Sequence, residues 1–283
     1  MIAAILSLIG GPLGQLYAGR GERFFGLALV THALIPTATL LAVSITSGRW
    51  VFNSLMVAAL CWPVFLVVDA FRCAKHAQQE GLSWYQRWWI YPLVLVAWLS
   101  TASLSSELCK AFIADTFVIP SRSMAPTIAA GDRIFSNRLV STDEAIEYGN
   151  VIVFNSKGPG SPLHVMRVIA LGGDTIEIRD EAVFLNGKVI DEPYASFAGD
   201  LPTYPDVANM APIKVPPNHF FVLGDARRRS FDSRFLGTIP TADFRGLAVR
   251  VFWSRSRDFT NPRNPQEYRT GPISWDRVGI RVH

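Results

Sequence analysis

The chain has 283 residues, enough for one or two folded units, and 49% of them are hydrophobic, a high fraction for a soluble protein. Its net charge of +4 comes without a basic run or an interleaving of basic with aromatic residues, which argues against a nucleic-acid-binding protein. All three cysteines precede residue 117, and the histidines of the second half are scattered, at His164, His219 and His283. That half therefore offers neither a disulfide nor a zinc site.

The N-terminal part predicts a membrane domain over residues 1–114. It contains three apolar stretches long enough to cross a bilayer, which needs about 20 residues. They run from Phe24 to about Thr46, from Val51 to about Phe71, and from Trp89 to about Phe112. The preceding segment, Met1–Tyr17, is apolar but broken by glycines and a proline. It has no basic start and no small-residue cleavage site, so we expect a short or re-entrant membrane segment rather than a removable signal peptide.

The loop charges predict how these spans are oriented. Arg72, Lys75 and Arg87 lie between the second and third spans, whereas the connection between the first two carries only Arg49. Basic loops stay in the cytoplasm, so the third span would place residues 115–283 on the outer face. The spans hold few charges, which gives little support to a transporter.

Residues 115–283 predict a mainly-β domain. From about Ile134 the sequence consists of short apolar runs bounded by turn residues, and Asn186-Gly187 is a strong hairpin signal. We expect a hairpin-rich insertion near residues 180–215. The predicted strands are 151–154, 164–171, 175–178, 182–185, 220–223 and 247–253.

Three motifs in this domain could carry chemistry. They are Ser121-Arg122-Ser123-Met124-Ala125-Pro126-Thr127, the stretch His164–Asp174, and the stretch Gly224–Gly237. A serine held just outside a membrane span could act as a nucleophile, although serine and proline are also common in plain loops. The third motif alternates Asp, Arg and Ser, which suits charge-assisted hydrogen bonds that fix a site, or else a solvated turn.

The order and spacing of these motifs resemble the type I signal peptidases, membrane-anchored serine proteases, from Phe117 to about Ser254. The resemblance implies a signal-peptidase catalytic domain in the bacterial cytoplasmic membrane, facing the outer or periplasmic side. It implies cleavage of secretory preproteins after small residues, with no metal or organic cofactor. The substrate would bind extended, as an added strand beside the cleft.

The resemblance also implies roles for individual residues. Ser123 would be the nucleophile, and Ser121 would supply a hydroxyl to the oxyanion hole beside the backbone N–H of Ser123. Ser230 would orient the general base. The supporting ion-pair residues would be Arg167, Asp225, Asp232 and Arg234.

The chain departs from the family at the general base. The family lysine that takes the serine proton corresponds here to Met166, whose thioether cannot accept that proton. Gly172 and Ala226 replace a usual proline and asparagine, and both changes look tolerable. His164 lies two residues before Met166, on the same face of a strand, and is an alternative base.

Three explanations follow for Met166. The chain could be an inactive membrane protein that binds signal peptides without cleaving them, which is the alternative function. It could use His164, or a water held by Ser230, as the base. A lysine could also have been changed to methionine deliberately.

Overall fold

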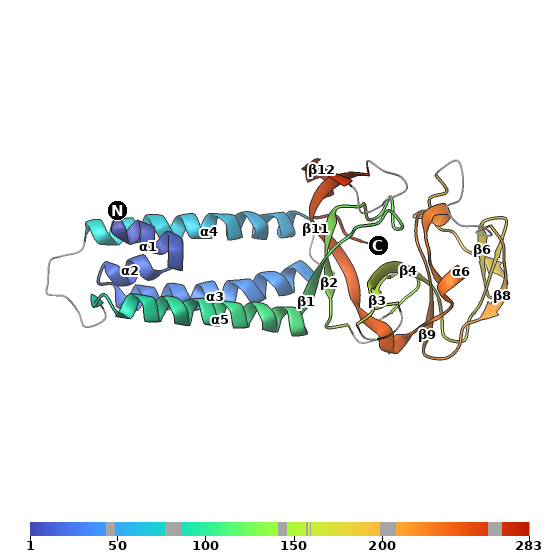
Figure 1. Ribbon diagram of the computed structural model, residues 1–283, viewed down its shortest axis with the longest axis horizontal. Helices are drawn as coiled ribbons and strands as arrows, with labels where there is room; N and C mark the ends of the chain where they lie inside the picture. The colour runs from blue at the N-terminus through green and yellow to red at the C-terminus, as the bar shows by residue number, and fades with distance from the viewer. Residues whose placement is uncertain are drawn as a thin grey trace. The chain divides into compact units, whose positions relative to one another are not determined.

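A computed structural model of the chain describes residues 1–43, 49–76, 86–140, 146–156, 158, 160–198, 208–259 and 268–282. The chain divides into two compact units, Met1–Ile113 and Ala114–His283. The first is helical and the second mainly β (Figure 1). This confirms the fold class expected from the sequence.

The described residues of the helical unit form two short and three long α-helices. The short ones are α1 (Ile2–Gly10) and α2 (Leu13–Tyr17), and the long ones, which run side by side (Figure 1), are α3 (Gly21–Val43), α4 (Arg49–Lys75) and α5 (Ile90–Phe112). Gly11 separates the short helices with a positive φ of 62°. The long helices coincide with the three predicted spans, although Thr46 lies outside the described residues.

Two of the long helices contain stretches long and apolar enough to cross a membrane. These stretches are Val57–Lys75 of α4 and Ile90–Lys110 of α5. Large apolar side chains project outward from both, among them Leu60 at 72% exposed and Val96 at 61%. The membrane location of α3 and of Met1–Tyr17 stays a prediction.

A polar network joins the first two helices to α4, and within it Ser7 of α1 donates to Gln15 Oε1 of α2 at 3.2 Å. Gln15 is fully buried, and its amide donates to the carbonyl oxygen of Leu66 at 3.0 Å and to the carboxylate of Asp69 at 3.1 Å. Arg23 donates to the same carboxylate at 2.9 Å. Since buried polar groups need partners, this network fixes the short helices against α4.

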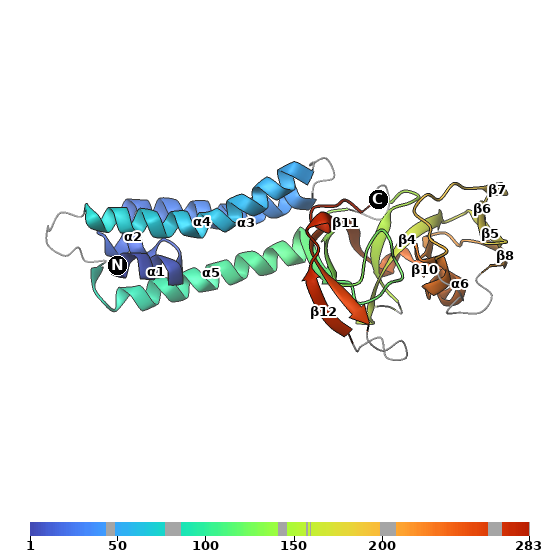
Figure 2. The ribbon, with the colours of Figure 1, turned by 90° about the horizontal axis from the view of Figure 1, so that it is seen from above.

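The β unit is built on one large antiparallel sheet. Its strands follow the order β1-β2-β11-β3-β4-β9-β10, and β12 pairs with β11 (Figure 2). The bounds are β1 (Ala114–Val118), β2 (Asp132–Asn137), β3 (Val151–Asn155), β4 (Leu163–Leu171), β9 (His219–Leu223), β10 (Ile239–Pro240), β11 (Phe244–Phe259) and β12 (Tyr268–Ile273).

A second sheet of four strands has the order β7-β6-β5-β8. Its strands are β5 (Thr175–Arg179), β6 (Ala182–Leu185), β7 (Lys188–Val189) and β8 (Met210–Lys214). Asn186 and Gly187 turn the β6–β7 hairpin with φ of 53° and 79°, as the sequence predicted. The insertion expected from residue 180 begins earlier, since β5 pairs with β6 and β8.

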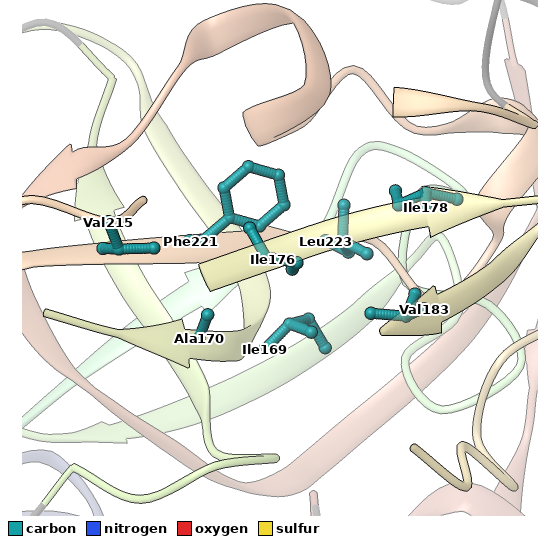
Figure 3. Packing of buried hydrophobic residues seen from close by; sticks show 8 residues of the cluster. All are labelled: Ile169, Ala170, Ile176, Ile178, Val183, Val215, Phe221 and Leu223. Carbon is teal, nitrogen blue, oxygen red and sulfur yellow. The ribbon is translucent and has the colours of Figure 1, made fainter. Parts of the chain in front are cut away.

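One apolar core joins the two sheets. Its side chains come from β4, β5, β6 and β9 and from Val215, and they meet between the sheets (Figure 3). The members are Ile169, Ala170, Ile176, Ile178, Val183, Val215, Phe221 and Leu223. This core fixes β4, which carries most of the second sequence motif, and β9, which leads directly into the third.

Short helical turns follow β9, β10 and β12. They are the 3₁₀ turn η2 (Arg227–Arg229), the single-turn α6 (Ser233–Leu236), the 3₁₀ turn η3 (Thr241–Asp243) and the 3₁₀ turn η4 (Trp275–Arg277). In the described part of this unit the longest helix is thus a single turn.

Candidate active site

The first motif forms a tight loop between β1 and β2. At its base, the N–H of Ile119 donates to the carbonyl oxygen of Asp132, and the N–H of Gly131 donates to that of Ile119, both at 2.8 Å. Met124 and Ile128 point into the core, at 1% and 0% exposed. These apolar anchors leave Ser121 exposed and Ser123 partly exposed, so both hydroxyls are accessible.

The two hydroxyls of this loop contact each other. Ser121 Oγ and Ser123 Oγ lie 3.0 Å apart, within hydrogen-bond distance. They open onto a cleft of about 410 Å³. One wall of the cleft is the segment 116–121 and the other is the start of β4, Leu163–Met166. The fold therefore brings Ser121 and Ser123 into one cleft with His164 and Met166, which are more than 40 residues away in the chain.

The β4 wall holds the position of the expected base. Met166 is 3% exposed and pairs in register with Ile152 of β3. His164 pairs with Phe154, and their ring centroids are 5.7 Å apart. Burial lowers the pKa of His164, because a charged imidazolium is poorly solvated there.

Part of β4 has one unpaired edge. Residues Leu163–Arg167 pair with β3 on one side, but the pairing with β9 on the other side begins at Arg167. Among the described strands, nothing pairs with that second edge over Leu163–Met166. This open edge faces the cleft that the serine loop shares.

Ser230 lies behind the serine loop with an unsatisfied hydroxyl. It is fully buried, and among the described residues its Oγ has no hydrogen-bond partner. A Cβ built on Gly224 would lie 2.2 Å from Ser230 Oγ and 2.6 Å from the carbonyl oxygen of Ser123. Gly224 thus separates Ser230 from the Ser123 backbone by the thickness of one main chain.

A buried ion pair ties β4 to the loop after β9. Arg167 Nε donates to Asp225 Oδ1 at 2.8 Å and Arg167 Nη2 to Oδ2 at 2.7 Å, with both side chains 1% exposed. Arg167 also donates to the carbonyl oxygen of Gly149 at 2.7 Å and to the Thr127 hydroxyl at 3.3 Å. Such a bidentate pair fixes both position and orientation.

A second ion pair shapes the same loop from within. Arg234 donates twice to the Asp232 carboxylate, each time at 2.8 Å, and once to the carbonyl oxygen of Arg227 at 2.7 Å. Asp232 Oδ2 also accepts the N–H of Gly224 at 3.1 Å. Asp232 therefore holds Gly224 in the position that lets it pass between Ser230 and Ser123.

Two further residues hold arginines of this region, and the sequence motifs did not indicate either of them. Glu192 accepts two hydrogen bonds of 2.6 Å from Arg227, and the Tyr194 ring lies 3.9 Å from the guanidinium carbon of Arg167. Both come from a short irregular segment after β7, which carries no periodic signal. Among the described residues, no three His, Cys, Asp or Glu side chains lie close enough together to share a metal ion.

Comparison with known proteins gives a consistent set of matches. A family model described as signal peptidase, peptidase S26, matches residues 90–253. Signal peptidase I P of Bacillus subtilis subsp. natto is 34% identical over 156 residues, 54% of this chain and 83% of that protein. A probable signal peptidase I-2 of Synechocystis is 30% identical over 187 residues, 64% of this chain and 83% of that protein. A solved signal peptidase I structure from Enterococcus faecalis is 28% identical, covers 37% of this chain and 97% of that one, and aligns with a TM-score of 0.30.

Proposed function

The chain belongs to the peptidase S26 family of signal peptidases, serine endopeptidases that remove signal peptides, and from that premise we propose that Ser123 is its nucleophile. The observation that carries the proposal is the shared cleft, where Ser121 and Ser123 lie opposite the start of β4. The substrates are secretory preproteins that reach the cleft from the membrane.

The reaction begins with attack of Ser123 Oγ on the carbonyl carbon of the scissile bond. The carbonyl oxygen becomes an oxyanion, which accepts hydrogen bonds from the Ser121 hydroxyl and the N–H of Ser123. Each such donor contributes about 3–4 kcal/mol of transition-state stabilisation. A general base takes the proton of Ser123 Oγ during attack and passes it to the amine of the mature protein, which leaves as the C–N bond breaks. Water then hydrolyses the acyl-enzyme, which frees the serine and the carboxylate of the signal peptide.

The open edge of β4 is the place for the substrate. An extended peptide laid along Leu163–Met166 gains main-chain hydrogen bonds that β9 leaves unused there. Alternate side chains of that peptide point into the cleft, where small residues fit. This arrangement brings the scissile bond to Ser123.

By comparison with the family, the general base is the group that this site lacks. By resemblance to the family, Met166 stands where a lysine would take the serine proton, and it cannot do so. The buried hydroxyl of Ser230 has no partner among the described residues, which fits a site built around a hydrogen-bonding group that Met166 does not supply. We therefore predict very low peptidase activity for the chain as it stands.

The alternative function is a membrane protein that binds signal peptides without cleaving them, and Met166 favours it. A second possibility keeps the enzyme active with His164 as the base. Its lowered pKa leaves the imidazole neutral, and so able to accept a proton, near neutral pH. In a third possibility, a water molecule held by Ser230 acts as the base.

One experiment separates these possibilities. The purified full chain is incubated with a labelled preprotein beside Met166→Lys, Ser123→Ala and Met166→Lys/Ser123→Ala. We expect cleavage by Met166→Lys, loss of that cleavage on adding Ser123→Ala, and little cleavage by the unchanged chain. Equal cleavage by the unchanged chain and Met166→Lys would contradict the role given to residue 166, and His164→Ala would then test the histidine.

The family is membrane-anchored, and α4 and α5 are apolar enough to serve as anchors. We further propose a multi-pass protein of the bacterial inner membrane with its β unit on the outer, periplasmic face. A protease added to one side of sealed membranes tests this, since it should reach the β unit from the outer side.

A further inference from the structure

Arg277 reaches back from the C-terminal segment to the serine loop. It is the last residue of η4 and lies beyond residue 253, where the match to the family model ends. Its Nη2 donates to the carbonyl oxygen of Thr127 at 3.0 Å, and its Nη1 lies 3.5 Å from that of Pro126. The two carbonyls belong to the turn that follows Ser123.

The same guanidinium holds the residue that ends the loop. Its Nη2 donates to Asp132 Oδ2 at 2.6 Å, and its Nε is 3.1 Å from both carboxylate oxygens. Asp132 is fully buried, and its Oδ2 accepts the N–H of Ala129 at 2.8 Å. One side chain therefore connects the middle of the loop to its end.

Thr127 is held from two sides. Its carbonyl oxygen accepts from Arg277, and its hydroxyl accepts from Arg167 at 3.3 Å. Arg277 is absent from the residues that line the cleft, so it acts on the loop from behind. A planar guanidinium can serve a carboxylate and neighbouring carbonyls at once, which a lysine ammonium cannot reproduce.

We propose that Arg277 is a positioning residue that fixes the Ser121–Thr127 turn, and thereby the Ser123 hydroxyl, for attack. This inference rests on the proposed role of Ser123. Displacement of a reacting group by about 1 Å can cost roughly 100-fold in rate. Loss of Arg277 should therefore lower kcat while the peptide still binds along β4.

The kinetic test uses the full-length Met166→Lys form with a signal-peptide substrate. Arg277→Gln should lower kcat by about 10- to 100-fold, with KM changed by no more than roughly twofold. Arg277→Lys should recover part of that loss. The matched control is Arg245→Gln, whose guanidinium donates to the carbonyl oxygen of its own neighbour Phe244 and which should keep kcat.

A second readout needs no peptidase activity. Hydrogen exchange is measured on the full chain with and without Arg277→Gln. The amides of Ile128 and Ala129, which donate to Met124 O and Asp132 Oδ2, should exchange faster, while those of β3 and β9 stay unchanged.

Unchanged exchange in the serine loop would overturn the proposal, and so would faster exchange throughout the β unit, since that marks a general structural role. An inactive Met166→Lys form would instead count against the proposed base position, and the exchange result would still decide the role of Arg277.

Discussion

The backbone N–H of Ala226 donates a 3.0 Å hydrogen bond to the carbonyl oxygen of Ser123. The loop after β9 is thereby bonded directly to the residue proposed as nucleophile. The neighbouring Asp225 carboxylate holds Arg167 of β4 through two hydrogen bonds. The pair Asp225–Ala226 thus joins the serine loop to the strand that carries Met166. A substitution that displaces the loop after β9 should therefore also displace Ser123.

Gly224 leaves no room for a side chain. An added Cβ would lie 2.2 Å from Ser230 Oγ and 2.6 Å from the carbonyl oxygen of Ser123, closer than real contacts allow. Gly224→Ala should therefore destabilise the protein by about 1–3 kcal/mol and abolish cleavage in the Met166→Lys form. The measurement is thermal unfolding in detergent together with preprotein cleavage. Gly26→Ala, where a Cβ meets nothing within 4 Å, is the control and should not lower stability.

Substitution of Ser230 should have different effects in the chain with Met166 and in the Met166→Lys form. Within the described part of the chain the buried Ser230 hydroxyl has no hydrogen-bond partner, and burying such a group costs about 1–3 kcal/mol. Ser230→Ala should therefore be neutral or stabilising in the chain with Met166, as measured by unfolding. With Met166→Lys, the same change should lower kcat, because the hydroxyl would then orient the amine.

Ser136 is the matched control for that pair of measurements. Its Oγ is also buried without a partner among the described residues. Ser136→Ala should leave kcat unchanged with either residue at position 166. A similar loss of kcat for both serines would count against a specific role for Ser230.

Breaking the buried ion pair of Arg167 and Asp225 should strongly destabilise the β unit. Asp225→Asn removes one charge of a pair that is 1% exposed on both sides, which leaves the Arg167 guanidinium uncompensated. We expect a loss of about 3–5 kcal/mol in the free energy of unfolding. The control is Glu107→Gln in the exposed Glu107–Lys110 pair, with side chains 66% and 53% exposed, where the change should stay below about 1 kcal/mol. Equal losses in the free energy of unfolding for Asp225→Asn and Glu107→Gln would show that burial does not set the strength of the Arg167–Asp225 pair.

His164 should make stability depend on pH. Burial lowers its pKa in the folded protein, so the unfolded chain takes up the proton first as the pH falls. Stability should therefore decrease on acidification through about 6.5, the ordinary histidine pKa, down to the lowered folded pKa. Unfolding measured across this range should show a smaller slope for His164→Gln. An identical slope of stability against pH in both proteins would exclude His164 as the source of the pH dependence.

The fold class could be predicted from the sequence because its signals are local. Apolar stretches of about 20 residues predicted helices at α4 and α5, and short apolar runs predicted β3 and β6. The hairpin turn predicted at Asn186-Gly187 is also confirmed. The boundaries of β11 were wrong: this strand runs from Phe244 to Phe259, and its outer part is held by β12 rather than by its own pattern.

The sequence by itself determined the kind of protein, since the serine motif, the His164–Asp174 stretch and the Asp–Arg–Ser loop are each continuous in the chain and were recognisable together. The tertiary structure decided how they meet. Arg167 finds Asp225 across 58 residues, and Arg277 finds Asp132 across 145. Such pairings depend on sheet register and on packing between distant strands, which no local pattern records. The same packing gave the Ser230 hydroxyl no partner among the residues that the structure describes, a property that no single position in the sequence could reveal.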